Sequence, residues 1–398
     1  MTTLGRNAAV GIVGAGAMGT GIAQVALLAG HEVLLGDASG MALEKAQRAL
    51  EAALQREVEK GRLDAATAAT ARARLSPILP DEKLAPYDRC AIVIEAVLED
   101  LDTKRSLFAA LEEVIAPDCV LATNTSSLSV GAIAAACRRP ERVIGTHFFN
   151  PAPVMPLVEV VPALRTSGDV LTAVKGLMKS WGKIVVVASD TPGFIVNRIA
   201  RPYYGEALCI VEDGSADVAT VDWAARELAG FKMGPFELMD FIGNDVNYAV
   251  TESIWRGTYF DARYRPSLVQ KRLVEAGYLG RKTGRGFYDY GAGVEPPRPR
   301  QDRALGEAIV QRILAMLVNE AVEAVRLRIA TVPDVELAMT KGVHYPKGLL
   351  AWGEELGFGQ VLAELERLRS EFGSERYRPS PLLRQLALRG RAALEELE

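Results

Sequence analysis

A histidine and a glutamate twelve residues apart are the residues of this chain best suited to chemistry. His147 follows a short apolar run, which predicts that it lies near the end of a strand. Glu159 lies within another apolar run, and the two-residue period of a strand places it on one face with Leu157 and Val161. A carboxylate there needs a partner, and it would orient an imidazole and favour its protonated form. The alternative is a structural core histidine beside an edge-strand glutamate, and the flanking segments favour the catalytic pair.

The N-terminal segment has the pattern of a dinucleotide-binding turn. An apolar strand at 8–13 leads into Gly14-Ala-Gly-Ala-Met-Gly19 and then into a helical segment. In this arrangement Gly14 makes a tight turn, Gly16 lets a pyrophosphate approach the helix N-terminus, and Gly19 permits contact between helix and strand. A second strand ends at Asp37, 23 residues after Gly14, where a carboxylate binds ribose hydroxyls.

The residues around Asp37 favour NAD over NADP. Ala38 and Ser39 follow it, and neither an arginine nor a lysine flanks it. A phosphate on the ribose would therefore lie against an anion without a compensating cation. We predict NAD as the cofactor.

Polar residues after two further predicted strands are candidates for the same crevice, because such sheets bind ligands at the carboxyl ends of their strands. Glu95 and Glu99 lie at the carboxyl end of the strand at 90–97, and Lys104 opens the next helix. The following strand leads into Asn124-Thr-Ser126. Helix capping is the structural alternative for side chains of this kind. We expect Asn124 and Ser126 to be available to a nicotinamide ring or a substrate oxygen.

Cations gather near the end of a predicted helical region that spans 39–75. Arg56, Lys60 and Arg62 lie there. Such a cluster is commonly a solvated helix face. The functional alternative is a contact with the phosphates of a large anionic substrate, for which Lys60 is the candidate.

The composition changes from alternating strand and helix to helix alone near residue 190. Thr191 is a suitable N-cap and Pro192 a suitable first helical residue, so we expect a long helix from here to about Glu212. Asn197 would lie in its second turn. Because its neighbours are apolar, we expect its amide to face a hydrogen-bonding partner.

The helical part of the chain repeats itself after a proline- and glycine-rich linker at 291–302. The segment Arg263–Ser267 returns unchanged as Arg376–Ser380, and three other residues recur 114 positions on: Arg198 as Arg312, Glu206 as Glu320, and Gly234 as Gly348. This predicts a tandem duplication. The expected parts are a dinucleotide-binding domain at 1–189, a helical domain at 190–290 and its copy at 303–398. The copy has Gln311 in place of Asn197, so we expect it to be structural and to pack against the first copy.

Composition excludes several classes of protein. A net charge of −4 with interspersed charges of both signs argues against a nucleic-acid binder. The four cysteines have no Cys-x-x-Cys spacing, which favours reduced thiols in a cytoplasmic protein and no metal site. We expect neither a secretory leader nor a membrane span, because the chain has no apolar run of about 18 residues.

With these motifs in place, the chain resembles the L-3-hydroxyacyl-CoA dehydrogenase family from Val10 through Tyr288. The segments that carry the resemblance are Gly-Ala-Gly-Ala-Met-Gly-Thr-Gly-Ile-Ala, Asn-Thr-Ser-Ser-Leu-Ser, Gly-Thr-His-Phe-Phe-Asn-Pro, Asp-Thr-Pro-Gly-Phe-Ile-Val-Asn-Arg, Met-Gly-Pro-Phe-Glu-Leu and Lys-Thr-Gly-Arg-Gly-Phe-Tyr. The fold it implies is an α/β Rossmann-type domain followed by two tandem all-α domains of the 6-phosphogluconate dehydrogenase type. Gly36 departs from the pattern, because an apolar strand residue is usual there.

The resemblance also implies roles for individual residues. His147 looks like the catalytic base and Glu159 its partner, while Ser126 and Asn197 look like the groups that hold the substrate oxygen. The residues that look like cofactor contacts are Gly14, Gly16, Met18, Gly19, Asp37, Glu99, Lys104, Asn124, Asn150 and Lys282. Lys60 is a candidate contact for coenzyme A.

The expected reaction is NAD-dependent oxidation of an L-3-hydroxyacyl-CoA to the 3-oxoacyl-CoA, and its reverse. One alternative is a dehydrogenase of the same fold that acts on a free 3-hydroxy acid or a sugar acid. Another is an NAD-binding protein without catalysis, against which the intact candidate residues argue. The second helical copy implies an intramolecular pseudo-dimer, and a homodimer stays open.

Overall fold

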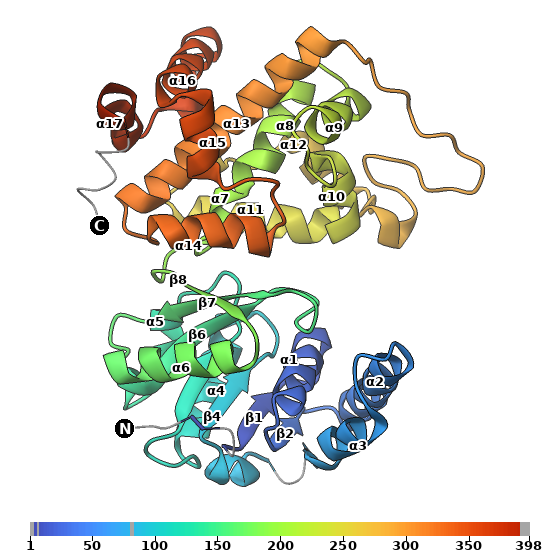
Figure 1. The fold of residues 1–398 in the computed structure, drawn as a ribbon, viewed down its shortest axis with the longest axis vertical. Coiled ribbons are helices and arrows are strands. Elements are labelled where there is room, and N and C mark those ends of the chain that lie inside the picture. Colours follow the sequence, from blue (N-terminus) through green and yellow to red (C-terminus); the bar gives the residue numbers. More distant parts are fainter. Residues whose placement is uncertain (1–3, 6–7, 80–82, 391–398) are drawn as a thin grey trace. The chain divides into compact units, whose positions relative to one another are not determined.

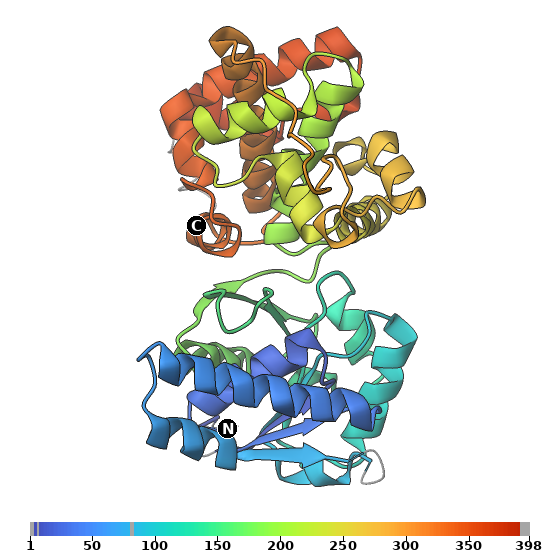
Figure 2. The same ribbon diagram turned by 90° about the vertical axis from the view of Figure 1, so that its right-hand side faces the viewer.

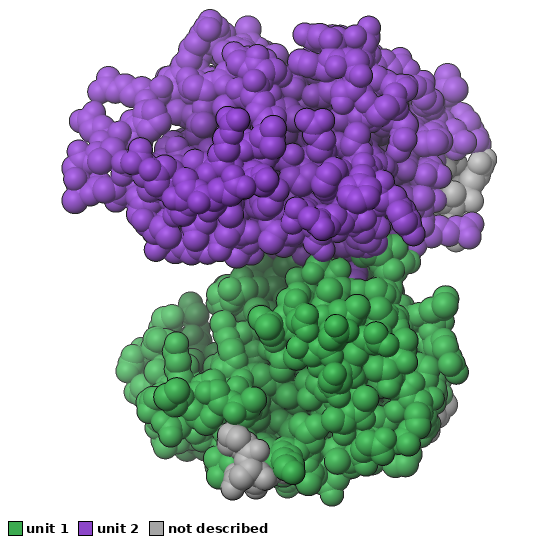
Figure 3. Space-filling model, turned by 180° about the vertical axis from the view of Figure 1, so that it is seen from behind, with its two compact units in different colours: residues 1–191 green, residues 192–398 purple. Residues whose placement is uncertain are grey.

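The computed structural model describes residues 4–5, 8–79 and 83–390. The chain divides into two compact units, Met1–Thr191 and Pro192–Glu398, which Figure 3 shows in different colours. None of the helices in these ranges combines the length and apolar character that crossing a membrane requires.

The first unit is built on an eight-stranded sheet with the strand order β3-β2-β1-β4-β5-β6-β7-β8. Neighbouring strands are parallel except for β6 and β7, which pair antiparallel. The order of the first six strands is that of a doubly wound nucleotide-binding sheet. The strands are β1 (Val10–Val13), β2 (Val33–Gly36), β3 (Leu75–Ile78), β4 (Ile92–Glu95), β5 (Val120–Thr123), β6 (Val143–Phe148), β7 (Leu157–Pro162) and β8 (Ile184–Val187).

Helices cover both faces of this sheet, so its strands are continuous apolar runs. Apolar residues of α1, α2 and α6 form one core with one face of the sheet, which includes Ile144. The next residue, Gly145, points the other way, because a Cβ there would lie 2.9 Å from the Val130 side chain of α5. The helices of this unit are α1 (Ala17–Leu28), α2 (Gly40–Glu59), α3 (Ala65–Ala73), α4 (Leu101–Glu112), α5 (Val130–Ala134) and α6 (Gly168–Ser180), with 3-10 turns at η1 (Ala85–Arg89) and η2 (Pro140–Arg142).

The region expected to be helical from 39 to 75 forms α2 and α3, and strand β3, which was not predicted, begins at its last residue and pairs parallel with β2. One local prediction was wrong. Thr191 is not an N-cap, and the helix begins only at Val196. Gly193 and Phe194 have φ angles of +79° and +47°, and left-handed backbone of this kind interrupts an α-helix.

The named elements of the second unit are all helices or single helical turns in its described residues (Figures 1 and 2), and isolated β-bridges join Arg285 to Gly280 and Asp289. Its first part contains α7 (Val196–Ile199), α8 (Arg201–Glu212), α9 (Val218–Glu227), α10 (Pro235–Ile242), α11 (Asn244–Gly257), η3 (Ala262–Tyr264), α12 (Leu268–Glu275) and η4 (Arg281–Thr283). Its second part contains α13 (Arg303–Arg326), α14 (Val332–Leu337), η5 (Ala338–Gly342), α15 (Leu349–Leu356), α16 (Phe358–Phe372), η6 (Glu375–Tyr377) and α17 (Pro381–Arg389).

The two parts of this unit repeat each other element by element. Helix α15 starts 114 residues after α10, α16 starts 114 residues after α11, and η6 starts 113 residues after η3. The long helix α13 packs against α8 and α9 of the first part. The apolar side of α8 is therefore covered within the same chain. The predicted fold class is confirmed: a Rossmann-type α/β unit followed by a duplicated helical one.

Candidate active site

The antiparallel pairing of β6 and β7 places His147 directly opposite Glu159. His147 Nδ1 lies 2.6 Å from Glu159 Oε2, and Glu159 is completely buried. The sheet fixes both backbones, so the carboxylate also fixes the plane of the imidazole ring. Nε2 is then the ring nitrogen directed away from this carboxylate.

The carboxylate of Glu99 organises the loop that follows β5. Its Oε1 accepts hydrogen bonds from the Thr125 hydroxyl at 2.6 Å and from the backbone N–H and hydroxyl of Ser126 at 2.9 and 3.3 Å. Lys104 Nζ lies 3.2 Å from Oε2 of the same carboxyl group. Burial acts to raise the pKa of Glu99, but Lys104 and these hydrogen bonds lower it below its usual value. Glu99 is therefore ionised at neutral pH.

Lys104 is buried and joins two carboxylates at the carboxyl end of the sheet. Its Nζ also lies 2.5 Å from Oε1 of Glu95, which accepts a hydrogen bond from Thr123 at its other oxygen. The structure thus brings together the predicted residues Glu99, Lys104 and Ser126. Glu95, expected with Glu99 among the carboxylates at the end of this strand, is the last residue of β4 and is completely buried.

Asn124 connects this loop to the strand that carries His147. Its side-chain oxygen accepts a hydrogen bond of 2.9 Å from the backbone N–H of Phe148. Asn124 and Ser126, which we expect to be available to a ligand, also contact the protein in this structure. They border the predicted site as parts of its framework.

The glycine turn after β1 has the expected geometry. Gly14 has a φ of +107°, and a Cβ there would lie 2.5 Å from the Ala96 carbonyl oxygen. A Cβ on Gly19 would lie 1.8 Å from the Gly14 carbonyl oxygen, which no side chain permits. Gly16, in contrast, faces open space and leaves the N-terminus of α1 without a side-chain cap. Backbone N–H groups there are available to an anion such as a pyrophosphate.

Asp37 borders a pocket of about 610 Å³ that also includes the glycine turn. Its two carboxylate oxygens accept hydrogen bonds from the backbone N–H groups of Ala15 (2.7 Å) and Ser39 (2.9 Å). The apolar walls include Ile78, Leu79 and Leu98. An adenosine fits this combination of apolar walls, an anion cradle and a carboxylate for the ribose. The residues present therefore fit NAD.

Tyr87 explains the unusual glycine at the end of β2. Its hydroxyl donates a 2.9 Å hydrogen bond to the Ile12 carbonyl oxygen, and its side chain is buried. A Cβ on Gly36 would lie 2.4 Å from that hydroxyl, and one on Gly11 would lie 2.6 Å from the ring. Tyr87 thus occupies the space that a larger residue at Gly36 would fill, beside the Asp37 pocket. Sequence reasoning missed Tyr87, because nothing local links it to a residue 51 positions earlier.

A buried lysine holds the loop between β6 and β7. Lys183 Nζ donates to the carbonyl oxygens of Ala152 and Met155 at 2.5 and 2.8 Å. Burial lowers the pKa of this ammonium group. Asn150 is exposed on the same loop and precedes a cis peptide bond to Pro151. Lys183 was not predicted, although a lysine directly before an apolar strand is the signal that marks it.

The remaining predicted residues lie apart from this cluster in the chain. Asn197 and Lys282 belong to the second unit, on α7 and η4 respectively. Asn197 lies in the first turn of α7, and not in the second turn of a longer helix as predicted. Lys282 Nζ contacts both carboxylate oxygens of Asp245 at 2.6 and 2.7 Å. Lys60 is the C-cap of α2 and forms an exposed ion pair with Glu57 at 4.0 Å.

Comparisons with known proteins place this architecture in one family. The model of the 3-hydroxyacyl-CoA dehydrogenase NAD-binding domain matches residues 9–191, and that of the C-terminal domain matches residues 193–290 and 309–396. The 3-hydroxyadipyl-CoA dehydrogenase of Escherichia coli (strain K12) is 40% identical, and the match covers 95% of this chain and 97% of that protein. The 3-hydroxybutyryl-CoA dehydrogenase of Bradyrhizobium diazoefficiens is 42% identical over 73% of this chain and 98% of its own length.

The fold agrees with a solved structure from the same group of proteins. The crystal structure of 3-hydroxybutyryl-CoA dehydrogenase from Escherichia coli K12 has a TM-score of 0.90 and 38% sequence identity, over 96% of this chain and 98% of that chain. Both the nucleotide-binding unit and the duplicated helical unit fall within that coverage. The chain belongs to the 3-hydroxyacyl-CoA dehydrogenase family.

Proposed function

We propose that this protein oxidises L-3-hydroxyacyl-CoA to 3-oxoacyl-CoA with NAD, and catalyses the reverse reduction with NADH, through His147 and Glu159. The observation that carries the assignment of these residues is the 2.6 Å contact between the two side chains at the carboxyl end of β6. The glycine turn after β1 and Glu95 of β4 lie at the carboxyl ends of strands that are parallel to β6 in the same sheet. Ligands of doubly wound sheets bind at this edge.

In the oxidation, the C3–H bond supplies a hydride and the hydroxyl group supplies a proton. Bound NAD provides the hydride acceptor. His147 takes the hydroxyl proton at Nε2, and a C=O bond forms as the two hydrogens leave C3 and its oxygen. Glu159 stabilises the imidazolium that results. Ser126, and Asn197 from the second unit, hold the substrate oxygen by hydrogen bonds. In the reduction, His147 returns the proton.

Other residues bind and orient the two substrates. Gly14, Gly16, Met18 and Gly19 form the turn for the pyrophosphate, and Asp37 takes the ribose hydroxyls. Glu99, Lys104, Asn124, Asn150 and Lys282 are proposed to line the rest of the cofactor site. Lys60 is the proposed contact for the phosphates of coenzyme A, for which it would leave its exposed ion pair with Glu57.

The candidate substrates differ in the length of the acyl chain. The Escherichia coli relative that matches 95% of this chain is named for 3-hydroxyadipyl-CoA, and the Bradyrhizobium relative is named for 3-hydroxybutyryl-CoA. We propose 3-hydroxyadipyl-CoA as the first substrate to test, because that relative matches both helical copies. The distinguishing experiment is a panel of 3-oxoacyl-CoA compounds assayed with NADH, including the 3-oxoadipyl and acetoacetyl thioesters and free acetoacetate. Equal rates with free acetoacetate would reject the need for coenzyme A.

We also propose the organisation and location of the chain. The functional parts are residues 1–189, 190–290 and 303–398, with a linker at 291–302, and the two helical parts form an intramolecular pseudo-dimer; residues 391–398 lie outside the described part of the chain. Reciprocal ion pairs between the two helical parts support this arrangement. The four cysteines are free, which supports a location in the cytoplasm.

A further inference from the structure

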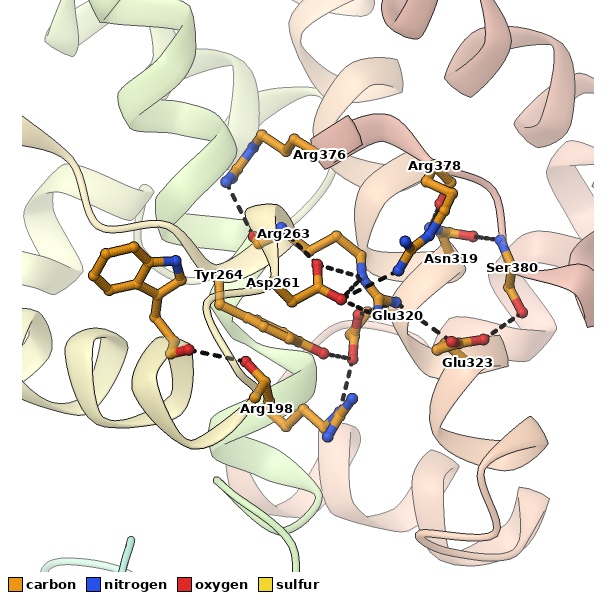
Figure 4. Close-up of polar contacts among 12 residues, drawn as sticks. Arg198, Asp261, Arg263, Tyr264, Asn319, Glu320, Glu323, Arg376, Arg378 and Ser380 are labelled. Atoms are coloured by element: carbon orange, nitrogen blue, oxygen red, sulfur yellow. Dashed lines mark hydrogen bonds and ion pairs between the residues drawn. The ribbon is translucent and has the colours of Figure 1, made fainter. Parts of the chain in front are cut away.

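Two arginines and two glutamates connect the helical copies by reciprocal contacts. Arg198 Nε donates to Glu320 Oε1 at 2.9 Å, and Arg312 Nε donates to Glu206 Oε1 at 2.5 Å. Each pair joins one copy to the other, and each residue is 114 positions from its counterpart. This is the pattern of an interface with two-fold symmetry, in which residue i contacts j and j contacts i. We call this cluster and its neighbours the seam; Figure 4 shows its Glu320 side.

A second arginine reaches each glutamate of the seam. On one side, Arg263 Nη1 lies 3.3 Å from Glu320 Oε2. On the other, its counterpart Arg376 donates from Nε to Glu206 Oε2 at 2.9 Å. Both arginines are almost completely buried. Each buried glutamate therefore has two guanidinium groups around it, and additional carboxylates must balance the excess positive charge.

On the Glu320 side, the carboxylate of Asp261 balances this excess positive charge. Its carboxylate accepts hydrogen bonds from Arg263 Nη2 at 2.8 Å and from Arg263 Nε at 3.2 Å, and the contacts are drawn in Figure 4. It also pairs with Arg378 at 3.2 Å. The Arg263 guanidinium thus has a partner on every edge.

On the Glu206 side, the position that corresponds to Asp261 is occupied by a serine. Ser374 is the counterpart of Asp261, 113 positions on. Both residues are N-caps of a 3-10 turn, and each side chain accepts a hydrogen bond from the backbone N–H two residues on, of Arg263 at 3.0 Å and of Arg376 at 3.3 Å. The backbone position is therefore the same, and the carboxylate is replaced by a hydroxyl.

A second carboxylate of the Glu320 side, that of Glu323, also has no carboxylate counterpart on the Glu206 side. Glu323 approaches Arg263 at 3.7 Å on the Glu320 side. Its counterpart on α8, 114 positions earlier, is Cys209. The Glu206 side of the seam therefore lacks these two carboxylates, although Asp213, whose counterpart is Leu327, pairs with Arg312 there at 2.8 Å.

The loss leaves a buried guanidinium nitrogen without a partner. Within the described part of the chain, Arg376 Nη2 makes no hydrogen bond, although the side chain is only 8% exposed. This nitrogen lies beside Gly205, where a Cβ would approach it to 2.5 Å. Arg265, the counterpart of Arg378, is exposed and has no ion pair among the described residues. A buried guanidinium N–H without a hydrogen-bond acceptor is costly, and an anion that reached Nη2 would satisfy it.

A pocket of about 450 Å³ lies at this place, between the two helical copies. Its walls include Gly205 and Cys209 of α8, and Ser374 and Arg376 of the second copy. The charged residues that line it are four arginines and two carboxylates: Arg265, Arg272, Arg312, Arg376, Glu212 and Asp213. Val269, Leu268 and Phe372 form an apolar part of the wall.

We propose that this pocket binds a small organic carboxylate, whose anionic group takes the place that Asp261 fills on the other side. The carboxylate pairs with Arg376 at the inner end and with Arg265 at the rim, and a short aliphatic chain contacts Leu268 and Phe372. The site lies wholly within the second unit and takes no part in hydride transfer. Its occupation stabilises the seam between the two helical copies.

The test compares hexanoate with hexanol and with sodium chloride at equal ionic strength, by thermal unfolding of the full chain. A tenfold excess of hexanoate over its dissociation constant should raise Tm by about 3–5 °C relative to sodium chloride, with a smaller effect of hexanol. The decisive variant is Ser374→Asp, which supplies the missing carboxylate from the chain itself. It should unfold at a higher temperature than wild type without ligand and should no longer respond to hexanoate.

Arg265→Gln serves as the second variant, because this exposed residue lies at the rim and its loss leaves the seam intact. It should weaken the response to hexanoate by about threefold to tenfold in concentration, as expected for one exposed or half-exposed ion pair. Binding of hexanoate in the active site would affect wild type and both variants alike. A wild-type Tm that hexanoate and sodium chloride change equally, or an undiminished response in both variants, overturns the proposal.

Discussion

His147 and Glu159 occupy directly opposed positions on two antiparallel strands, with Nδ1 and Oε2 separated by 2.6 Å. Backbone hydrogen bonds of the sheet hold both residues, so their separation does not depend on a loop. A pair fixed in this way acts as a single unit, in which loss of either member removes most of the benefit of the other. This relationship supports the first prediction.

Replacing His147 by Gln should lower kcat by at least about a hundredfold, because glutamine keeps part of the hydrogen bonding but cannot carry the proton. The affinity for NADH should change little, since the cofactor pocket is formed by the glycine turn and Asp37. Steady-state reduction of acetoacetyl-CoA, together with NADH binding followed by fluorescence, measures both quantities.

Glu159→Gln and the double variant provide the control for this pair. The single change should be similarly damaging, and the double variant should be little worse than either single one. Losses that multiply in the double variant, or a kcat near wild type in His147→Gln, would show that the proton is transferred elsewhere.

NADH should be strongly preferred to NADPH. The Asp37 carboxylate already accepts two backbone hydrogen bonds, so it cannot turn away from a phosphate without losing them. Two close like charges reduce affinity by on the order of a hundredfold. The ratio of kcat/KM for the two cofactors tests this directly, and a ratio near one would contradict the role given to Asp37.

Tyr87 and Gly36 should behave as a coupled pair. Gly36→Ala places a Cβ about 2.4 Å from the Tyr87 hydroxyl, so it should destabilise the first unit by about 1–3 kcal/mol and raise KM for NADH. Tyr87→Phe leaves the Ile12 carbonyl oxygen without this hydrogen bond, at a cost of about 1 kcal/mol.

The double variant distinguishes a direct contact from two separate effects. Removing the hydroxyl leaves Cζ as the nearest ring atom, at 3.5 Å from the new methyl group, which is an ordinary contact. Gly36→Ala should therefore cost less in the Tyr87→Phe background than in wild type. Urea unfolding of the four proteins gives the coupling energy, and strictly additive values would reject the proposed fit.

Asp222 should make stability depend on pH. Burial raises its pKa from 3.8 to about 7, although its carboxylate accepts hydrogen bonds from the backbone of Phe236 and Glu237. Between about pH 4 and pH 7 the folded state then binds a proton that the unfolded state has released. The free energy of unfolding should fall as pH rises through this window, by on the order of a few kcal/mol, and level off above it.

Asp222→Asn is the matched control for this prediction, since asparagine has the same shape and does not titrate. Urea unfolding at pH 5 and pH 7.5 should show a smaller difference in the variant than in wild type. An equal difference in both proteins would assign the pH dependence to other groups.

A chain that ends near Tyr290 should be insoluble or should dimerise. It would expose the apolar side of α8 and leave Glu206 without Arg312 and Arg376. A buried charge that loses its partners typically costs about 3–5 kcal/mol. Size-exclusion chromatography and thermal unfolding test this, and a monomer with unchanged activity and Tm would mean that the second copy serves another purpose.

Local patterns in the sequence predicted the parts of the fold that local physics decides. The strand–glycine–helix segment from 10 to 28 follows from hydrophobic period and glycine sterics. Strand alternation placed Glu159 among apolar side chains, and the need of such a carboxylate for a partner suggested His147, which the structure places opposite it. The error at Thr191 has a local cause too, because Gly193 and Phe194 adopt left-handed backbone that an N-cap rule does not consider. Strand β3 was missed because Pro77 argues against a strand, although an edge strand tolerates proline.

Local patterns in the sequence did not predict contacts between residues that are far apart in the chain. Tyr87 meets Gly36 only after β1 and β4 have paired, and Lys183 meets Ala152 only across the β6–β7 loop. The repeat spacing revealed the duplication, yet it did not show that Arg198 bonds to Glu320 of the other copy. Pairing of this kind is a property of packing and leaves no period in the sequence.

The difference between Asp261 in the first helical copy and Ser374 at the corresponding position of the second has a consequence for how such a protein evolves. In a homodimer, one substitution in the gene alters both halves of the interface at once, so the two sides always remain identical. A duplicated chain has no such constraint, because each half is encoded separately. One side of the interface can then keep its ion pairs within the chain. The other side can lose a carboxylate and gain a binding site for a small molecule from solution.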